Sequence, residues 1–245
     1  MSNYKKTKNL GISVFFPCYN DQGSIGMVVD NTVKTLKKLT TDFEVIVIDD
    51  GSKDSSREIL KKYSQKYFQL KLVFHKKNKG YGGALRSGFK AATKELIFYT
   101  DGDGQYDVKE LPILLSLLTD DVNFINGIKM SRQDPNYRIL LGNIYSLIAR
   151  WMFWLPVYDV DCDFRLIRKS VVQKIALKNN SGAICIELVK KAQRSGAKFR
   201  QVSVHHYKRQ WGQSQFFHFN RLLATFRELI SLWIRLMIIE KINRL

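Results

Sequence analysis

The sequence has few of the residues that build disulfide frameworks or zinc modules. Its 245 residues include three cysteines, which lie far apart and form no C-x-x-C pair, and this argues against both classes. No stretch reaches the roughly 18 uncharged apolar residues of a membrane span. Residues 1–9 are polar and basic, and the apolar stretch after them is short and ends at Pro17. We therefore expect no secretory signal and a cytoplasmic protein with free thiols.

Several common functional motifs are also missing. The glycine-rich segment after residue 77 has neither the G-x-x-x-x-G-K-[ST] pattern of a Walker loop nor the G-x-G-x-x-G pattern of dinucleotide-binding proteins. No serine–histidine–acid arrangement is supported by order or spacing. The formal net charge is +18, but the RNP1 motif, zinc spacing and a basic recognition helix are absent. We expect no nucleic-acid partner, and the charge indicates a phosphorylated substrate or an anionic membrane surface.

Four short apolar runs predict the strands of a parallel sheet. They cover residues 11–16, 43–48, 70–74 and 96–100, and near-continuous runs of this length are typical of strands buried on both faces. Helical patterns lie between them, which predicts an α/β fold with right-handed crossovers. Beyond residue 105 we expect strands near 123–128, 164–168 and 199–204, helices over 137–155 and 184–194, and one or two helices over 216–245.

Polar motifs follow the four predicted strands. Ligands of open α/β sheets gather at the carboxyl ends of strands, so these motifs predict a binding site there. The motifs are Pro17-Cys18-Tyr19-Asn20-Asp21, Asp49-Asp50-Gly51-Ser52, Asn78-Lys79-Gly80-Tyr81-Gly82-Gly83 and Asp101-Gly102-Asp103-Gly104-Gln105.

The last motif predicts a divalent cation site. Asp101 and Asp103 are one residue apart, the glycines allow a tight turn, and Gln105 adds a third oxygen. Hard oxygen ligands of this kind suit Mg²⁺ or Mn²⁺. The alternative is a turn in which Asp and Gly serve only the backbone. The three neighbouring strand-end motifs favour the cation.

Six motifs in this order resemble the inverting family 2 glycosyltransferases with the GT-A fold, and most of all their dolichyl- or polyprenyl-phosphate sugar synthase branch. The resemblance covers about residues 10–215. It implies a Rossmann-like, mostly parallel sheet flanked by helices over residues 1–214, followed by an amphipathic helical segment over 215–245. The matching residues are Pro17-x-x-Asn20-Asp21, Asp49-Asp50-Gly51-Ser52-x-Asp54, Asn78-x-Gly80 with Ala84-Leu85-Arg86-x-Gly88, Asp101-x-Asp103-x-Gln105, Asp159-x-x-Cys162-x-Phe164-Arg165-Leu166 and Arg209-x-x-Gly212-x-Ser214.

The resemblance also implies an activity and a set of site residues. The enzyme would be a metal-dependent hexosyltransferase that moves a sugar from a UDP- or GDP-sugar to a polyprenyl phosphate in cell-envelope synthesis. Catalytic roles fall to Asp101, Asp103 and Arg209, with Asp101, Asp103 and Gln105 on the Mg²⁺ or Mn²⁺ ion. The donor would be bound by Pro17, Tyr19, Asp21, Asp49, Asp50 and Gly80, and the acceptor phosphate by Lys129, Arg138 and Ser214. The chain departs from the family pattern at Asp21 (usually Glu), Lys129 (often Arg) and Asp163 (often Gly).

Two alternative activities stay open. A lipid phosphate is already ionised and needs no general base, whereas the hydroxyl of a glycan or protein would need one, and Asp159, Asp161 and Asp163 are then the candidates. A nucleotidyltransferase would be expected to carry its phosphate loop after the first strand, where this chain has Pro17-Cys18-Tyr19-Asn20.

The C-terminal segment predicts an amphipathic helix. Leu222, Phe226, Leu229 and Trp233 lie on one broad apolar face, and residues 139–158 form a second apolar stretch. Such a helix can lie on an anionic bilayer, so we expect peripheral association with the inner face of the membrane. The alternatives are packing on the domain and a homo-oligomer interface.

Overall fold

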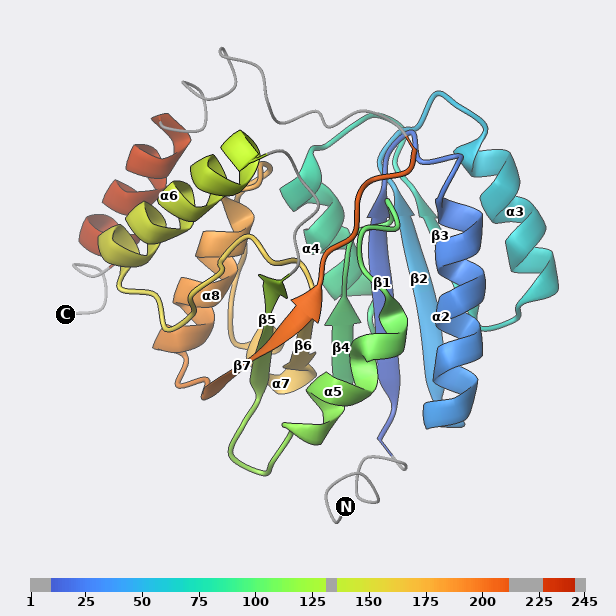
Figure 1. Cartoon of the computed structure of the whole chain (residues 1–245), viewed down its shortest axis with the longest axis horizontal. Coiled ribbons are helices and arrows are strands. Elements are labelled where there is room, and N and C mark those ends of the chain that lie inside the picture. Colours follow the sequence, from blue (N-terminus) through green and yellow to red (C-terminus); the bar gives the residue numbers. More distant parts are fainter. Residues whose placement is uncertain (1–9, 131–135, 212–226, 241–245) are drawn as a thin grey trace.

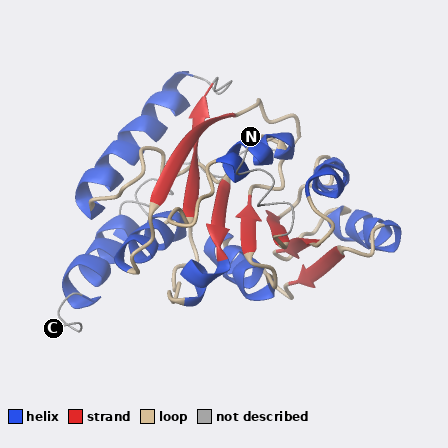
Figure 2. Ribbon diagram, turned by 90° about the horizontal axis from the view of Figure 1, so that it is seen from below, coloured by secondary structure: helices blue, strands red, loops and turns tan. Residues whose placement is uncertain are grey.

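A mixed sheet of seven strands runs through the residues that the computed structural model describes, which are 10–130, 136–211 and 227–240. The strand order is β3-β2-β1-β4-β6-β5-β7, and helices cover both faces (Figure 1). Seen from below, the strands form a twisted row with helices on both sides (Figure 2). The predicted α/β architecture is confirmed.

The four strands predicted from apolar runs form the parallel half of the sheet. The residues of β1, β2 and β4 are buried almost throughout, because helices cover both faces of the sheet. Their apolar sequences agree with this burial. The burial of β3 is only partial because it lies at the edge of the sheet. These strands are β1 (Ile12–Cys18), β2 (Phe43–Asp49), β3 (Leu70–Phe74) and β4 (Leu96–Tyr99).

The other half of the sheet is mixed in direction. Strands β5 (Phe124–Met130) and β7 (Phe199–His205) pair in parallel. Strand β6 (Arg165–Arg168) lies between β4 and β5 and is antiparallel to both. The predicted ranges agree with these strands to within two residues. The direction of β6 was not predicted, because a short apolar run carries no signal for orientation.

The prediction that Pro17 ends the first strand is wrong. Strand β1 continues through Pro17 to Cys18, and Asp50 N donates to Cys18 O at 2.9 Å. Neighbouring residues of a strand direct their backbone groups to opposite sides, so Pro17 faces away from β2. On that side β4 has already ended at Tyr99, and the missing N–H of Pro17 breaks no ladder bond.

Two apolar cores result from the alternation of side chains along the strands. Val14 and Phe16 point to one face, whereas Phe15 and Tyr99 point to the other. The first core is covered by α2 (Ile25–Leu39), α3 (Ser56–Lys66), η1 (Val108–Glu110) and α5 (Leu111–Ser116). The second is covered by α4 (Tyr81–Ala91), α6 (Asn136–Phe153), α7 (Lys169–Gln173) and α8 (Ile184–Arg194).

Residues 227–240 are helical and include a π-helical stretch, η2 (Ile234–Ile239). Leu229, Leu232 and Leu236 are buried in the second core, and Trp233 Nε1 donates to Met152 O of α6 at 2.9 Å. This part of the chain therefore packs on the domain. Leu222 and Phe226 of the predicted apolar face lie outside the described residues. Among the helices of the described ranges, none has the length and apolarity needed to cross a membrane.

The close approach of α4 to β1 predicts the effect of a methyl group at Gly88. A Cβ there would lie 2.3 Å from Phe15 Cδ2, and the Phe15 ring is held by Phe89 and Tyr99. Gly88→Ala should therefore lower the free energy of unfolding by about 1–3 kcal/mol in urea denaturation. The control Lys90→Ala, on the exposed side of α4, should change it by less than about 0.5 kcal/mol. Equal stabilities for the two variants would contradict this packing.

Candidate active site

Three of the four strand-end motifs meet directly at the carboxyl ends of β1, β2 and β3. Asn20 N donates to Ser52 Oγ at 3.0 Å, and Lys53 N donates to Asn20 Oδ1 at 2.8 Å. Lys79 N, from the motif after β3, donates to Asp50 Oδ1 at 2.8 Å. The motif after β4 joins them because Pro17 O lies against Gly102. The predicted convergence of the four motifs is therefore present.

The two aspartates after β2 have different partners. Asp49 is fully buried and forms an ion pair with Arg57 Nε at 2.6 Å. Asp50 Oδ1 lies 2.6 Å from His75 Nδ1, and His75 Nε2 lies 2.8 Å from Ser87 Oγ. Asp49 is thus held inside the fold, and Asp50 is fixed at the edge of the site. Sequence reasoning missed Arg57 and His75, although His75 directly follows β3 and the strand-end rule could have found it.

The loop after β1 places Asp21 beside Arg209. Asp21 Oδ2 accepts from Tyr19 N at 3.0 Å, and Asp21 Oδ1 accepts from Arg209 Nη2 at 3.0 Å. Arg209 Nη1 also lies 3.8 Å from Asp103 Oδ2. One guanidinium therefore bridges two carboxylates that come from β1 and β4. The structure thus brings together Tyr19, Asp21, Asp103 and Arg209, four of the residues expected in the site.

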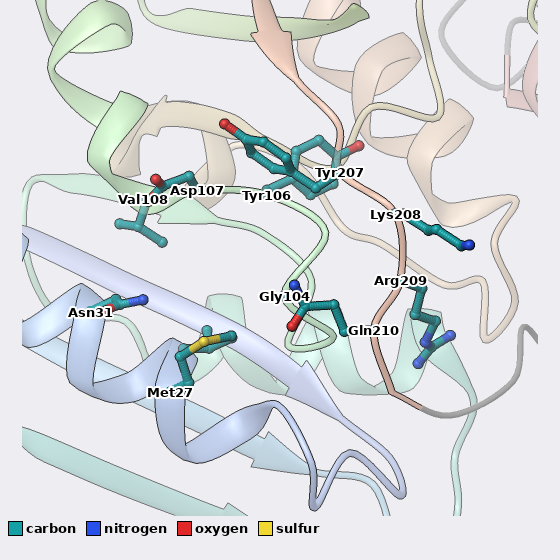
Figure 3. A pocket seen from close by; sticks show the side chains of 11 residues that line it. Met27, Asn31, Gly104, Tyr106, Asp107, Val108, Tyr207, Lys208, Arg209 and Gln210 are labelled. Carbon is teal, nitrogen blue, oxygen red and sulfur yellow. The ribbon is translucent and has the colours of Figure 1, made fainter. Parts of the chain in front are cut away.

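Residues 207–211 run across the Asp-x-Asp turn. Tyr207 N donates to Gln105 O at 2.8 Å, and Gln105 Nε2 donates to Tyr207 O at 3.0 Å. This segment and α2 enclose a groove of about 610 Å³ (Figure 3). In Figure 3, Gly104, Tyr207 and Arg209 lie on one side of the groove and Met27 lies on the other. Arg209 and Gly104 line this groove, whereas Asp21, Asp101 and Asp103 do not, so it lies beside the carboxylates of the site.

Asp101 lies in the turn after β4, two residues beyond the last residue of that strand. Its Oδ1 accepts from Tyr81 OH at 2.9 Å, in the first turn of α4. Loss of hydration raises the pKa of Asp101 well above its ordinary value, and the carboxylates of Asp163 and Asp103 raise it further. Burial likewise raises the pKa of Asp21 to about 6. The site therefore brings together carboxylates whose charged forms are disfavoured, first by burial and then by their acidic neighbours.

This donor set fits a divalent cation. Asp101, Asp103 and Gln105 offer hard oxygens, and a doubly charged ion would offset the repulsion that raises the pKa of Asp101. Asp103 Oδ1 accepts from Gln105 N at 3.0 Å, which closes the turn. Within the described ranges, no three His, Cys, Asp or Glu side chains form a ready cation cluster. An ion here would therefore use the amide of Gln105 or ligand oxygens besides the two carboxylates.

Of the three residues predicted to bind the acceptor phosphate, the structure describes the side chain of Lys129. Lys129 Nζ donates to Asp161 O at 2.8 Å and lies 3.5 Å from Asp159 Oδ1, so it supports the turn after residue 158. Arg138 lies in α6, but its side chain is outside what the structure describes, as is Ser214. Gly80, predicted to contact the donor, starts α4 with φ +78°, and its N–H donates to Asn78 Oδ1 at 2.9 Å.

A buried polar cluster supports this side of the site. Arg165 is fully buried, donates to Asn126 Oδ1 at 2.6 Å, and also contacts Tyr99 OH and Val160 O. Asp163, which departs from the family pattern, accepts a hydrogen bond from Cys185 Sγ at 3.2 Å. A charged group buried in this way needs several partners. The sequence motif around Arg165 was the one signal of this cluster, and the partners of Arg165 could not have been found from the sequence.

An unusual apolar surface lies on α6 and the C-terminal helix. We call it the α6 face, and α6 exposes it at helical spacing away from the core. The flanking segment after α6 adds Trp154 and Tyr158, and residues 227–240 add further isoleucines. The exposed residues are Tyr137, Leu140, Leu141, Ile144, Leu147, Ile148, Trp151, Trp154, Tyr158, Ile230, Ile234, Ile238 and Ile239.

The sheet order and the strand-end carboxylates define a GT-A glycosyltransferase fold. The chain belongs to glycosyl transferase family 2, whose sequence profile matches residues 13–176. The structure of glucosyl-3-phosphoglycerate synthase from Mycobacterium tuberculosis with Mn²⁺, UDP and glucosyl-3-phosphoglycerate has a TM-score of 0.72 at 18% identity, over 95% of this chain and 82% of that chain. Its structure with Mg²⁺ and UDP gives 0.71 at 15% identity, over 96% and 82%. At these identities the likeness shows the fold.

Two curated relatives match most of this chain but a smaller fraction of their own length. The undecaprenyl-phosphate 4-deoxy-4-formamido-L-arabinose transferase of Yersinia enterocolitica is 26% identical over 217 residues, or 88% of this chain. The protein of the same name from Salmonella choleraesuis is 26% identical over 221 residues, or 90% of this chain. The chain spans 65% and 66% of the length of these two relatives.

The raised pKa of Asp21 predicts how stability changes with pH when a chelator is present. Because the pKa of about 6 in the folded protein lies above the ordinary 3.8, the folded state holds the proton more tightly. The stability that protonated Asp21 contributes is therefore present below pH 4 and lost as pH rises through 6. Asp21→Asn should be more stable than the wild type by about 3 kcal/mol at pH 8.

Urea denaturation at pH 4, 6 and 8 checks this prediction. The advantage of Asp21→Asn should shrink to near zero at pH 4, because the wild-type carboxyl is then neutral as well. The control Asp121→Asn changes an exposed carboxylate on a loop and should show no such trend. An advantage for Asp21→Asn that is equal at all three pH values would contradict the assignment.

Proposed function

We propose that the protein is a divalent-cation-dependent inverting glycosyltransferase that moves a sugar from a nucleotide-sugar donor to polyprenyl phosphate. The observation that carries this proposal is the meeting of Asp21, Asp101, Asp103 and Arg209 at one edge of the sheet. The names of the relatives support the acceptor. The UDP and Mn²⁺ or Mg²⁺ in the similar structures support the donor and the ion.

The donor would lie across the ends of β1, β2 and β4. Tyr19, Asp21 and Asp50 would contact the nucleoside, with Asp50 fixed by Lys79 N and His75. Asp101, Asp103 and Gln105 would hold the cation, and Pro17 and Gly80 would shape the backbone around the diphosphate. When bound, the cation would stabilise the nucleoside diphosphate as it leaves. Arg209 would exchange its carboxylate contacts for a phosphate, since a guanidinium pairs well with either group.

A phosphate acceptor also agrees with the state of the nearby carboxylates. Asp159 is paired with Lys129, and Asp163 contacts Tyr99 and Cys185 inside the fold. Neither is free to take a proton from a hydroxyl, and an ionised phosphate oxygen requires no base. Asp161, whose pKa burial raises to about 7, is the residue that favours the alternative, transfer to the hydroxyl of a glycan or protein.

We also place the α6 face on the bilayer surface. Between Tyr137 and Trp151 its exposed positions carry no acidic side chain, and Trp151, Trp154 and Tyr158 cluster at one end. Tryptophan and tyrosine prefer the interface between lipid and water. Arg150, whose guanidinium lies 4.1 Å from the Tyr158 ring, adds positive charge there. Together with the net charge of +18, this suits an anionic lipid surface and gives the enzyme access to a lipid-linked acceptor.

Substitution of the second aspartate tests the cation and the acceptor together. Asp103→Asn should lower transfer by at least about 10²-fold, because it removes a charged ligand from the site. The assay incubates labelled UDP- and GDP-hexoses with undecaprenyl phosphate and Mn²⁺, and counts label in the organic phase. Asp121→Asn, which alters an exposed carboxylate on a loop outside the site, is the matched control and should retain activity.

Three results would contradict parts of this proposal. Full activity of Asp103→Asn, or undiminished wild-type transfer with excess chelator, would exclude the cation site. A labelled product that stays in the aqueous phase would exclude the lipid acceptor and favour the hydroxyl alternative.

The α6 face predicts the effect of charge on membrane binding. Leu147→Glu with Trp151→Glu places two carboxylates on exposed positions. Each lost apolar side chain is worth about 1.5–3 kcal/mol, so binding to phosphatidylglycerol vesicles should fall by more than about tenfold in a sedimentation assay. Phe68→Glu, at an 89% exposed position before β3, is the control and should bind as the wild type does. Equal loss in both variants would contradict the assignment of the α6 face.

A further inference from the structure

We propose that Glu187 is a positioning residue that couples the C-terminal helix to the aspartates of the donor site. The inference rests on the proposed function, because it concerns the residues expected to hold the cation. Glu187 lies in α8, which lies between α4 and α6 (Figure 1). It does not belong to any of the strand-end motifs.

Glu187 is a buried carboxylate with partners on three sides. Its side chain has no exposed surface. It accepts from the backbone N–H groups of Lys178 and Asn179, at 3.1 and 2.8 Å. Lys191 Nζ and Arg235 Nη2 complete its shell at 2.9 and 3.1 Å. A buried charge is costly when it loses its partners, so Glu187 restrains residues 178–179 and the C-terminal helix in their positions.

The segment that Glu187 holds lies against the start of α4. Asn180 O accepts from Gly82 N at 2.8 Å, so the segment supplies a backbone partner to the first turn of the helix. A Cβ at Gly80 would lie 2.4 Å from Asn180 O, and one at Gly82 would lie 2.4 Å from Asn179 O. Arg86, also in α4, donates to Lys178 O at 3.0 Å. The backbones of residues 179–180 and of Gly80 and Gly82 are therefore in close contact, and a shift of residues 178–180 would displace the start of α4.

The start of α4 in turn holds Asp101. Tyr81 is the first residue of the helix, and its hydroxyl donates to Asp101 Oδ1 at 2.9 Å. Gly80, one residue earlier, is a predicted donor contact. The path from Glu187 therefore runs through the backbone of residues 178–180 and through Tyr81 to the first aspartate of the Asp-x-Asp turn. Every step of it is a hydrogen bond or a backbone contact.

At its outer end the path reaches the C-terminal helix. Arg235 lies in η2, on the helix whose isoleucines contribute to the α6 face. That helix contacts α8 a second time through Glu240, which lies 3.3 Å from Lys191 Nζ and 3.7 Å from Arg194 Nη1. Glu240 has no contact with residues 178–180 among those described. Glu240 shares Lys191 with Glu187, but its loss leaves the contacts of Glu187 with residues 178, 179 and Arg235 in place. Glu240→Gln therefore tests the loss of a helix contact without the loss of the path itself.

The test measures how Mn²⁺ supports nucleotide binding. Titration of Mn²⁺ at fixed UDP, and separately at fixed GDP, gives the ion concentration for half-maximal binding by calorimetry, well below the unfolding temperature of every variant. Glu187→Gln keeps the size of the side chain and removes its charge. It should raise that concentration by about fivefold or more, and Glu240→Gln should leave it within about twofold.

A double-mutant cycle tests the path itself. Tyr81→Phe removes the hydrogen bond to Asp101 and should raise the same concentration. If both residues act through one path, the double variant should show less than the product of the two single effects. An effect equal to the product, or a Glu187→Gln value equal to that of Glu240→Gln, would overturn the inference.

Two further results are decisive. If Glu187→Gln does not fold, Arg235→Gln replaces it, because Arg235 is partly exposed and its loss leaves Glu187 paired with Lys191. It should shift the Mn²⁺ requirement in the same direction, and a wild-type value would overturn the inference. Wild-type protein that binds neither nucleotide with Mn²⁺ would instead overturn the proposed function, and the inference with it.

Discussion

Crowded carboxylates at the ends of parallel strands are the constraint on which the site depends. Because β1 and β4 are adjacent and parallel, the loops that follow them bring Asp21, Asp101 and Asp103 together. Burial and mutual repulsion raise the pKa values of Asp21 and Asp101. The structure offsets this repulsion with one bridging guanidinium, from Arg209. We expect such a site to be stabilised most when a cation and an anionic ligand bind together.

The rest of the fold keeps that repulsion from disrupting the edge of the sheet. Arg57 neutralises Asp49 behind the site, and Arg165 joins the turn after residue 158 to β4 and β5. Arg165 is fully buried, and Arg57 is partly exposed but paired with the buried Asp49. These two positive charges near the site therefore serve the structure.

The sequence predicted the parts of the structure that depend on local patterns. Strands β1 to β4 follow from continuous apolar runs, and the convergence of the polar motifs follows from their place after parallel strands. The antiparallel direction of β6, the pairing of Lys129 with Asp159 and the shell of Glu187 depend on contacts between distant residues. No spacing in one sequence reports such contacts. Pro17 shows the same limit, since its effect on β1 depends on where β4 ends.

The placement of the α6 face relative to the site gives the two proposals a common physical basis. Helix α8 contacts both α6 and α4, and the C-terminal helix contacts α8 through Arg235 and Glu240. Helix α8 therefore links the surface that we propose for lipid with residues 178–180, which contact the start of α4. Buried ion pairs weaken if a helix that carries one partner shifts, because the attraction offsets the desolvation cost only while the geometry is good. Occupation of the lipid surface and order in the donor site are for this reason expected to favour each other.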